Sequence, residues 1–163
     1  MSDFNLEKRV WWSDLDNGLQ ELLKESVLLI EKSGNWERHF SDYSFCVFPA
    51  AKAYEGFLKI VFLKLGFMTE RQFMGRRFRV GKALNPDLDK RYREKEGVYD
   101  RLVAYCNGSA TADELWKTWK ECRNILFHWF PKEGKRNVNL AQAREKIMQI
   151  LSAMDLLYKE CKI

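Results

Sequence analysis

Three side chains between residues 123 and 128 have the types and spacing needed for acid–base chemistry on a phosphate ester. Arg123 and Asn124 are adjacent, and His128, one of only two histidines in the chain, follows five residues after the arginine. An imidazole gains and loses a proton near neutral pH, and a guanidinium binds phosphate oxygens. Together they can cleave a phosphodiester without a metal ion. Because this spacing also arises by chance, the interpretation depends on the elements that position these residues.

Apolar residues recur at helical spacing along most of the chain, and no segment shows the alternation of a strand. This pattern predicts four long helices, at residues 14–33, 49–66, 112–130 and 140–161. We therefore expect an all-α, up-and-down bundle of these four helices, with one or two short helices between the second and the third. No linker rich in Pro, Gly or Ser divides the chain, so residues 1–163 are expected to form a single domain.

Residues near the ends of these segments predict where each helix begins. Ser13 is expected to cap the first helix, and Pro49 is expected in the first turn of the second. Thr111 and Glu114 have the spacing of a capping box at the start of the third helix. Asn139 precedes the fourth helix and is expected to cap it.

The predicted third helix places Asn124 and His128 away from its apolar stripe, at about 100° per residue. A histidine buried for packing would point into the stripe, so this position favours either a functional histidine or an ordinary exposed one. His128 also falls in the last predicted turn, where free carbonyl groups favour a cation. The residues of the stripe are Leu115, Trp119, Cys122, Leu126 and Trp129.

The composition indicates a folded protein with an anionic partner. The net charge of +5 and the pI near 9.0 favour nucleic acid as that partner, although many basic proteins bind no nucleic acid. The first residues carry charges and lack the apolar core of a signal peptide, and the aliphatic cluster at residues 27–30 is too short to cross a bilayer. We expect a cytoplasmic protein that does not contact membranes.

The four cysteines and two histidines show no metal-binding pattern. No two cysteines form a C-x-x-C pair, and the histidines lie far apart in the sequence. The expectation is four mostly buried free thiols in a reducing cytosol, rather than a zinc site or a disulfide framework. No metal and no cofactor are expected.

A helical bundle in which a polar residue and a histidine follow an arginine by a few positions resembles the HEPN superfamily of ribonucleases. Residues 48–58, 78–86 and 115–131 also resemble the HEPN domain of RnlA-type toxin ribonucleases, and the resemblance extends over about residues 44–158. It implies a metal-independent endoribonuclease, in a toxin or antiviral defence role, that leaves 2′,3′-cyclic phosphate and 5′-hydroxyl ends. It also implies a homodimer in which two motifs line one cleft, with an antitoxin or another regulatory protein as a candidate partner.

The resemblance assigns a role to each residue of the motif. His128 would act as base or acid, Arg123 would bind the phosphate and offset its developing charge, and Asn124 would position a neighbour or donate a hydrogen bond. Glu55 matches an acidic residue on a preceding helix, which implies that it orients Arg123 or His128. An ordinary ion pair with Lys59, four residues on, is an equally good reading of Glu55 from the local sequence.

Basic residues outside the motif are predicted to contact the RNA backbone. These substrate-binding residues are Arg76, Arg77, Arg79, Lys82 and Lys52. Phe78 lies among the first four and could stack on a base, although a solvated surface loop has the same composition. The alternative to an endoribonuclease is a catalytically silent HEPN module that binds RNA, a nucleotide or a protein partner.

Overall fold

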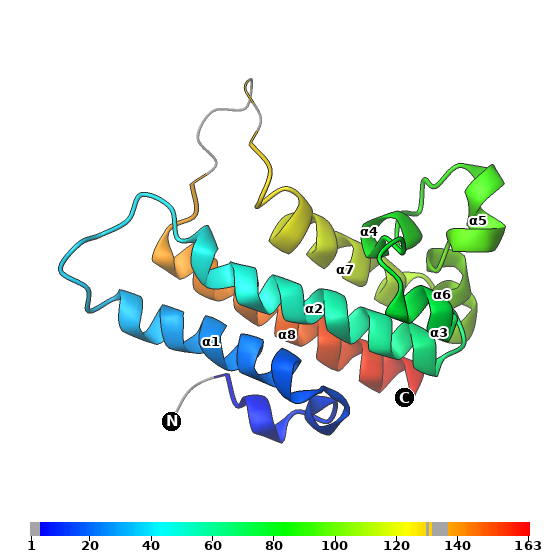
Figure 1. Ribbon diagram of the computed structural model, residues 1–163, viewed down its shortest axis with the longest axis horizontal. Helices are drawn as coiled ribbons and strands as arrows, with labels where there is room; N and C mark the ends of the chain where they lie inside the picture. The colour runs from blue at the N-terminus through cyan, green and yellow to red at the C-terminus, as the bar shows by residue number, and fades with distance from the viewer. Residues whose placement is uncertain (1–3, 130, 132–136) are drawn as a thin grey trace.

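The regular structure of the chain is helical throughout the part that the computed structural model describes, which is residues 4–129, 131 and 137–163. Within these ranges, eight α-helices, two 3₁₀-helical turns (Leu6–Lys8 and Trp12–Asp14) and one π-helical turn follow one another without a strand (Figure 1). The all-α prediction is therefore confirmed. No helix in the same ranges is both long and apolar enough to cross a membrane.

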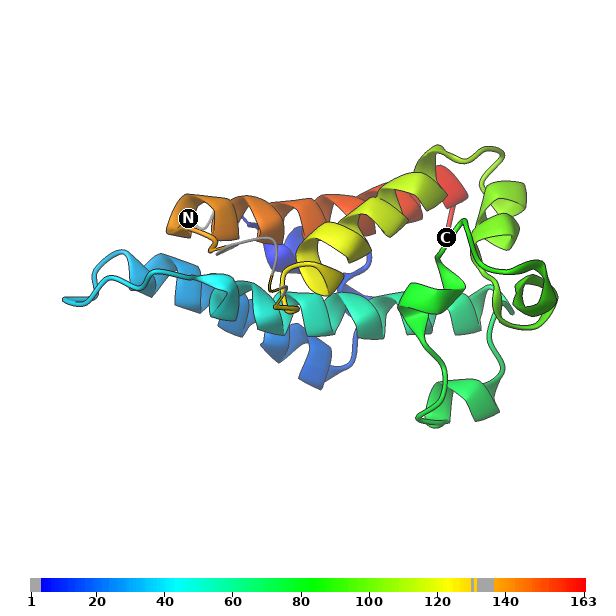
Figure 2. The ribbon, with the colours of Figure 1, turned by 90° about the horizontal axis from the view of Figure 1, so that it is seen from above.

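The helix α2 (Ser44–Lys64) supplies a large share of the hydrophobic core. Helices α1 (Asn17–Ser33) and α8 (Leu140–Cys161) lie along it (Figure 1). Seen from above, α7 (Ala110–Trp119) lies over the space between α2 and α8 (Figure 2). Burial of large aromatic side chains is a main source of stability in such a core, and α2 contributes three fully buried ones, Tyr54, Phe57 and Phe62.

Helix α2 begins at Ser44, five residues before the predicted start at Pro49. A proline inside a helix lacks the N–H group and crowds the carbonyl group of the preceding turn. Next to it, the buried hydroxyl of Ser26 on α1 donates to the carbonyl oxygen of Cys46 and accepts from the N–H of Ala50 at 3.2 Å. A regular helix pairs those two backbone groups with each other. A side chain from another helix thus lets α2 continue through its proline.

Replacing Ser26 by alanine is expected to lower the free energy of unfolding by about 1–3 kcal/mol. The reason is that the carbonyl group of Cys46 and the N–H of Ala50 lose a buried polar partner. Urea unfolding followed by circular dichroism measures the loss. Ser152 is exposed on α8, so Ser152→Ala is the matched control and should change stability by less than about 0.5 kcal/mol. Equal stabilities for the two variants would show that Ser26 does not support the helix.

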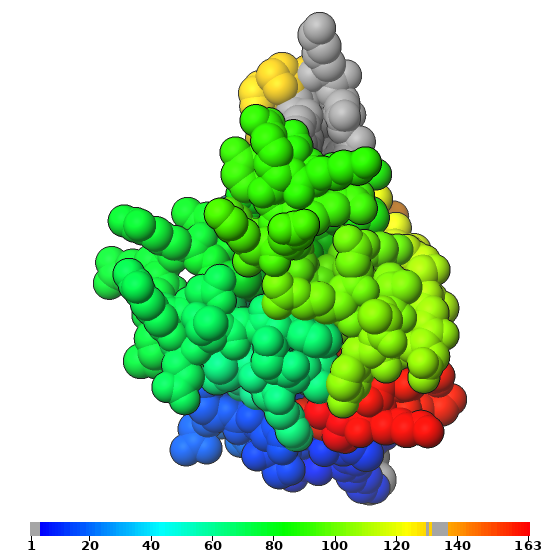
Figure 3. Space-filling view, turned by 90° about the vertical axis from the view of Figure 1, so that its right-hand side faces the viewer, coloured from blue at the N-terminus to red at the C-terminus, as the bar shows by residue number. Residues whose placement is uncertain are grey.

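The segment between α2 and α7 forms four short helices rather than the one or two predicted. They are α3 (Glu70–Met74), α4 (Val80–Ala83), α5 (Lys90–Glu96) and α6 (Tyr99–Tyr105). None of them exceeds two turns, which is too short for apolar periodicity to identify. They gather at one end of the molecule and cover much of that face (Figure 3).

A disulfide bond joins Cys106, directly after α6, to Cys161 at the end of α8. The prediction of four free thiols is therefore wrong, and Cys46 and Cys122 are the free, buried cysteines. The two bonded residues lie 55 positions apart in sequence, with no motif that links them, and the fold brings their Cα atoms to 4.6 Å. In Figure 3 the red end of α8 lies beside α6. The bond ties the short-helix segment to the core.

The caps of the long helices agree only in part with the sequence signals. Asp16, not Ser13, caps α1, because its carboxylate accepts from the N–H three residues later at 2.9 Å. Helix α7 begins at Ala110, so Thr111 is buried inside the helix instead of capping it. Asn139 caps α8 through a complete capping box, and the predicted bounds of this helix are confirmed.

Candidate functional site

The helix that carries Arg123 changes its geometry just before this residue. Helix α7 ends at Trp119 and continues as a π-helical turn, η3 (Lys120–Asn124), in which the N–H of Ile125 donates to the carbonyl oxygen of Lys120 at 2.8 Å. A π-helical turn holds an extra residue, which rotates the side chains that follow it, and such turns are frequent at functional sites. The prediction of a regular helix to residue 130 is therefore wrong in its second half.

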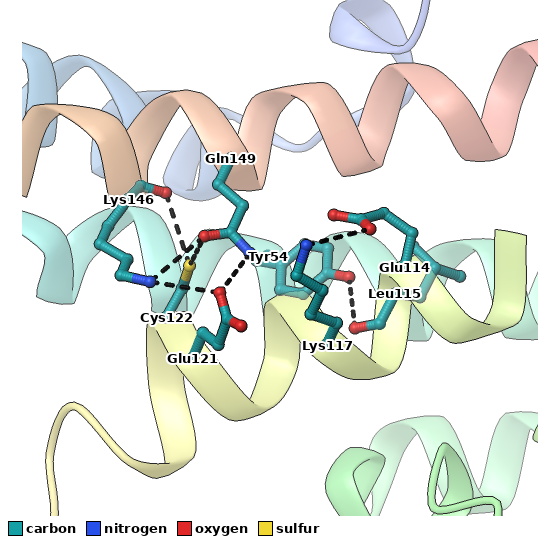
Figure 4. A network of polar contacts seen from close by, with 8 residues as sticks. All are labelled: Tyr54, Glu114, Leu115, Lys117, Glu121, Cys122, Lys146 and Gln149. Atoms are coloured by element: carbon teal, nitrogen blue, oxygen red, sulfur yellow. Dashed lines mark hydrogen bonds and ion pairs between the residues drawn. The ribbon is translucent and has the colours of Figure 1, made fainter. Parts of the chain in front are cut away.

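The first anchor of this helix is a buried hydrogen bond from α2. The hydroxyl of Tyr54 donates to the carbonyl oxygen of Leu115 at 3.2 Å (Figure 4). Burial raises the pKa of Tyr54 well above its ordinary value, so the hydroxyl keeps the proton that it donates. The bond fixes α7 against α2 one turn before η3 begins.

The second anchor joins η3 to α8 (Figure 4). The Sγ atom of Cys122 lies 3.3 Å from the side-chain oxygen of Gln149 and 3.6 Å from the carbonyl oxygen of Lys146, so its single S–H group is shared between these two acceptors. Burial raises the pKa of Cys122 to about 12, so this thiol stays a donor. Although burial opposes it, hydrogen bonds from Gln149 and Lys146 hold the pKa of Glu121 below its ordinary value. Arg123 directly follows these clamped residues.

Arg123 is held by a carboxylate and an indole. Its Nη2 atom lies 2.6 Å from Oε2 of Glu55 on α2, and its guanidinium carbon lies 4.7 Å from the ring centroid of Trp119. The other oxygen of Glu55 lies 3.3 Å from Nζ of Lys59. Both contacts considered for Glu55 from the sequence are thus present in the molecule. The side chain of Arg123 is 40% exposed, and its guanidinium carries five N–H donors, more than the contact with Glu55 uses.

A pocket of about 290 Å³ opens beside this ion pair. Its lining contains Glu55, Arg79, Gly81, Lys82, Trp116, Trp119, Arg123 and Asn124. Five of these residues are predicted site residues, which come from α2, the short-helix segment and η3. Three cationic side chains and one carboxylate give the lining a positive balance that suits an anionic ligand. Lys82 already contacts Glu96 at 2.7 Å and lies 4.1 Å from the ring centroid of Tyr92, so a phosphate would compete for it.

The other predicted site residues lie outside the lining of this pocket. Lys52 is exposed on α2, and Arg76 and Arg77 are exposed in the connection between α3 and α4. His128 is exposed and follows a turn after η3, so the predicted position in a last helical turn is wrong. For the same reason Trp129, predicted in the apolar stripe, is 81% exposed. The structure brings Glu55 and Arg123 into contact but does not place the imidazole in their pocket.

Gly81, Trp116 and Trp119 belong to the pocket but were not predicted as site residues. Trp119 was predicted in the apolar stripe and Trp116 was given no role, and the signal that could have identified both is their spacing from a cation. Trp116 and Trp119 each lie four residues before a cation, and Lys120 and Arg123 lie over the respective rings. Gly81 lets α4 approach the indole of Trp119, since an added Cβ atom would lie 2.4 Å from its Nε1 atom.

Replacing Gly81 by alanine is expected to destabilise the protein by about 1–3 kcal/mol, because α4 must move away from Trp119. The same movement carries Arg79 and Lys82 away from Arg123 and should weaken anion binding in the pocket. Thermal unfolding and RNA binding measure the two effects. Gly34→Ala is the matched control, since its Cβ atom meets only a Leu140 methyl group at 3.7 Å. Indistinguishable behaviour of the two variants would contradict the close approach.

Comparisons with protein-family models, with curated proteins and with solved structures give no match for this chain. Among the residues that the structure describes, no group of three or more His, Cys, Asp or Glu side chains is arranged to hold a metal ion. The functional interpretation therefore depends on the geometry of the site and on the chemistry of its residues.

Proposed function

We propose that this chain is a metal-independent endoribonuclease of the HEPN type, with Arg123 and His128 as its catalytic pair. The observation that carries the proposal is the anchored, half-exposed guanidinium of Arg123 in a basic pocket, five residues before an exposed histidine. A fixed guanidinium binds a phosphate without first losing conformational freedom. Two polar anchors support this role, because one holds α7 before η3 and the other holds η3 itself, directly before the arginine.

The proposed reaction is a transesterification within the RNA strand, in which the protein transfers protons and forms no covalent bond to the substrate. His128 removes the proton of a ribose 2′-hydroxyl, and the 2′-oxygen forms a bond to the adjacent phosphorus. The bond between phosphorus and the 5′-oxygen breaks, and this oxygen takes a proton from a second imidazole or from water. The products are a 2′,3′-cyclic phosphate and a 5′-hydroxyl end. Arg123 stabilises the charge on the phosphate oxygens, with Asn124 as a hydrogen-bond donor.

A homodimer is part of the proposal, together with the up-and-down bundle typical of HEPN domains. His128 lies outside the Arg123 pocket of its own chain. A second copy could bring another imidazole to that pocket, so that two motifs form one cleft. We further propose that the protein acts in the cytoplasm as a toxin or in antiviral defence. An antitoxin or another regulatory protein would control it.

One observation favours the second candidate function, a catalytically silent module that binds RNA, a nucleotide or a protein. Oε2 of Glu55 contacts Nη2 of Arg123 at 2.6 Å, on the guanidinium that would bind a phosphate. A carboxylate in this position weakens phosphate binding through repulsion of like charge. The two functions differ in whether bound RNA is cut.

Incubation of the purified protein with mixed-sequence single-stranded RNA in EDTA tests the proposal. We expect cleavage in the absence of divalent metal, with 2′,3′-cyclic phosphate ends that resist phosphatase until acid opens the ring. RNA that binds to the protein but stays intact would support the silent module. Cleavage that stops in EDTA, or that leaves 5′-phosphate ends, would contradict the proposed chemistry.

A further inference from the structure

Phe48 on α2 and Phe127, four residues after Arg123, form an aromatic pair of which Phe48 is exposed and Phe127 is half-buried against the core. The side chain of Phe48 on α2 is 54% exposed, and its ring packs edge-on against Phe127, with centroids 5.4 Å apart at an interplanar angle of 78°. Trp129, two residues further along the chain, is 81% exposed. Aromatic rings gathered at a surface, next to polar groups, are typical of a binding site.

The aromatic pair lies outside the lining of the Arg123 pocket, about two helical turns from it along α2. Phe48 contacts Phe127 and Glu55 contacts Arg123, so α2 and the segment 123–127 run side by side in opposite directions. Phe48 and Glu55 are seven positions apart, about 10 Å along α2, and Lys52 is exposed between them. The N–H of Phe127 donates to the carbonyl oxygen of Arg123 at 3.3 Å, so Phe127 lies one turn after Arg123 along the backbone. The surface thus presents aromatic rings, then a lysine, then an arginine.

We propose that Phe48 and Phe127 form a stacking site for a nucleobase of the RNA strand whose phosphate binds at Arg123. This inference rests on the proposed function and names a part of the substrate that the pocket itself does not hold. Proteins bind single strands through cationic groups that follow the backbone and aromatic rings that stack on bases. The cations of Lys52 and Arg123 favour a nucleic-acid strand over an apolar protein partner at this surface. Stacking accepts any base, so the site adds affinity without strict sequence preference.

The test measures binding of fluorescent 2′-O-methyl RNA octamers, which cannot form the cyclic phosphate, by anisotropy. One octamer carries all bases, and each of the others lacks the base at one position. For the wild type, we expect one position at which base loss weakens binding by roughly 5- to 150-fold, the effect of one lost stack. Phe48→Ala should weaken binding of the complete octamer by the same factor and should erase the effect of base loss at that position.

Tyr105→Ala is the matched control, because Tyr105 is 47% exposed and packs edge-on against Phe67 at 6.0 Å. Unchanged binding of the complete octamer by Phe48→Ala would overturn the stacking site and leave the ribonuclease proposal intact. If Phe48→Ala halves the molar mass in solution and weakens all octamers equally, the aromatic pair is an interface between two copies, and the inference is wrong. A wild type that neither binds these octamers nor cuts RNA would overturn both the inference and the proposed function.

Discussion

Replacing His128 by alanine is expected to slow RNA cleavage by about 10²–10⁴-fold, the usual contribution of a general acid or base. Binding of uncleavable RNA should change much less, because His128 does not line the pocket that would hold the phosphate. Initial rates with single-stranded RNA in EDTA measure the first effect, and anisotropy measures the second.

His39→Ala is the control for this substitution. His39 is the other histidine of the chain, is exposed, and lies in the connection between α1 and α2. We expect its removal to leave the cleavage rate unchanged. Equal rates for the wild type and His128→Ala would exclude His128 from the chemistry and would indicate a contaminant or a different site.

Replacing Arg123 by alanine is expected to reduce cleavage by about 10²–10³-fold, because the charge on the phosphate oxygens loses its stabilising cation. RNA binding should also weaken, since the guanidinium is a principal cation of the pocket. Arg91→Ala is the control, because Arg91 is 77% exposed on α5 and contacts Asp89. Equal effects of the two substitutions would reduce Arg123 to one surface charge among several.

Glu55→Gln separates two roles of the carboxylate. Glutamine keeps an oxygen that accepts from the guanidinium of Arg123 but removes the negative charge near the phosphate. We expect a smaller change in rate than for Arg123→Ala. A rate equal to that of the wild type, with stability slightly reduced, would assign Glu55 to its ion pair with Lys59 on α2.

The bounds of the helices could be predicted where the signal lies in the neighbouring residues. They could not be predicted where a residue far away in the sequence determines where the helix begins. The start of α8 follows from Asn139 and the N–H groups beside it, and the sequence predicted it correctly. Pro49 is a local signal for a helix start, but a hydroxyl on α1 supports the helix before it. The π-helical turn η3 has no signature in the apolar pattern. Asn124 and His128 are exposed, as expected, but the regular helix from which their directions were predicted is interrupted by this turn.

The candidate site could be predicted only where a residue type alone indicates its chemistry. Arg123 was singled out for its charge and its distance from His128. Its contact with Glu55, 68 positions earlier, could be expected only through a resemblance, since the local sequence offered Lys59 as an equal partner. Gly81 was not predicted as a site residue. Its importance comes from the absence of a side chain where α4 packs against the indole of Trp119, and the sequence does not show that these two residues meet.

The most direct measurement is the activity of a mixed dimer. A chain with Arg123→Ala and a chain with His128→Ala carry different affinity tags, are expressed together, and are purified so that only complexes with both tags remain. If two copies share one cleft, the mixed dimer retains one intact arginine and one intact histidine there. We predict that it cuts RNA in EDTA well above the rate of either variant alone. A mixed complex no faster than its parents, or chains that do not co-purify, would contradict a shared site.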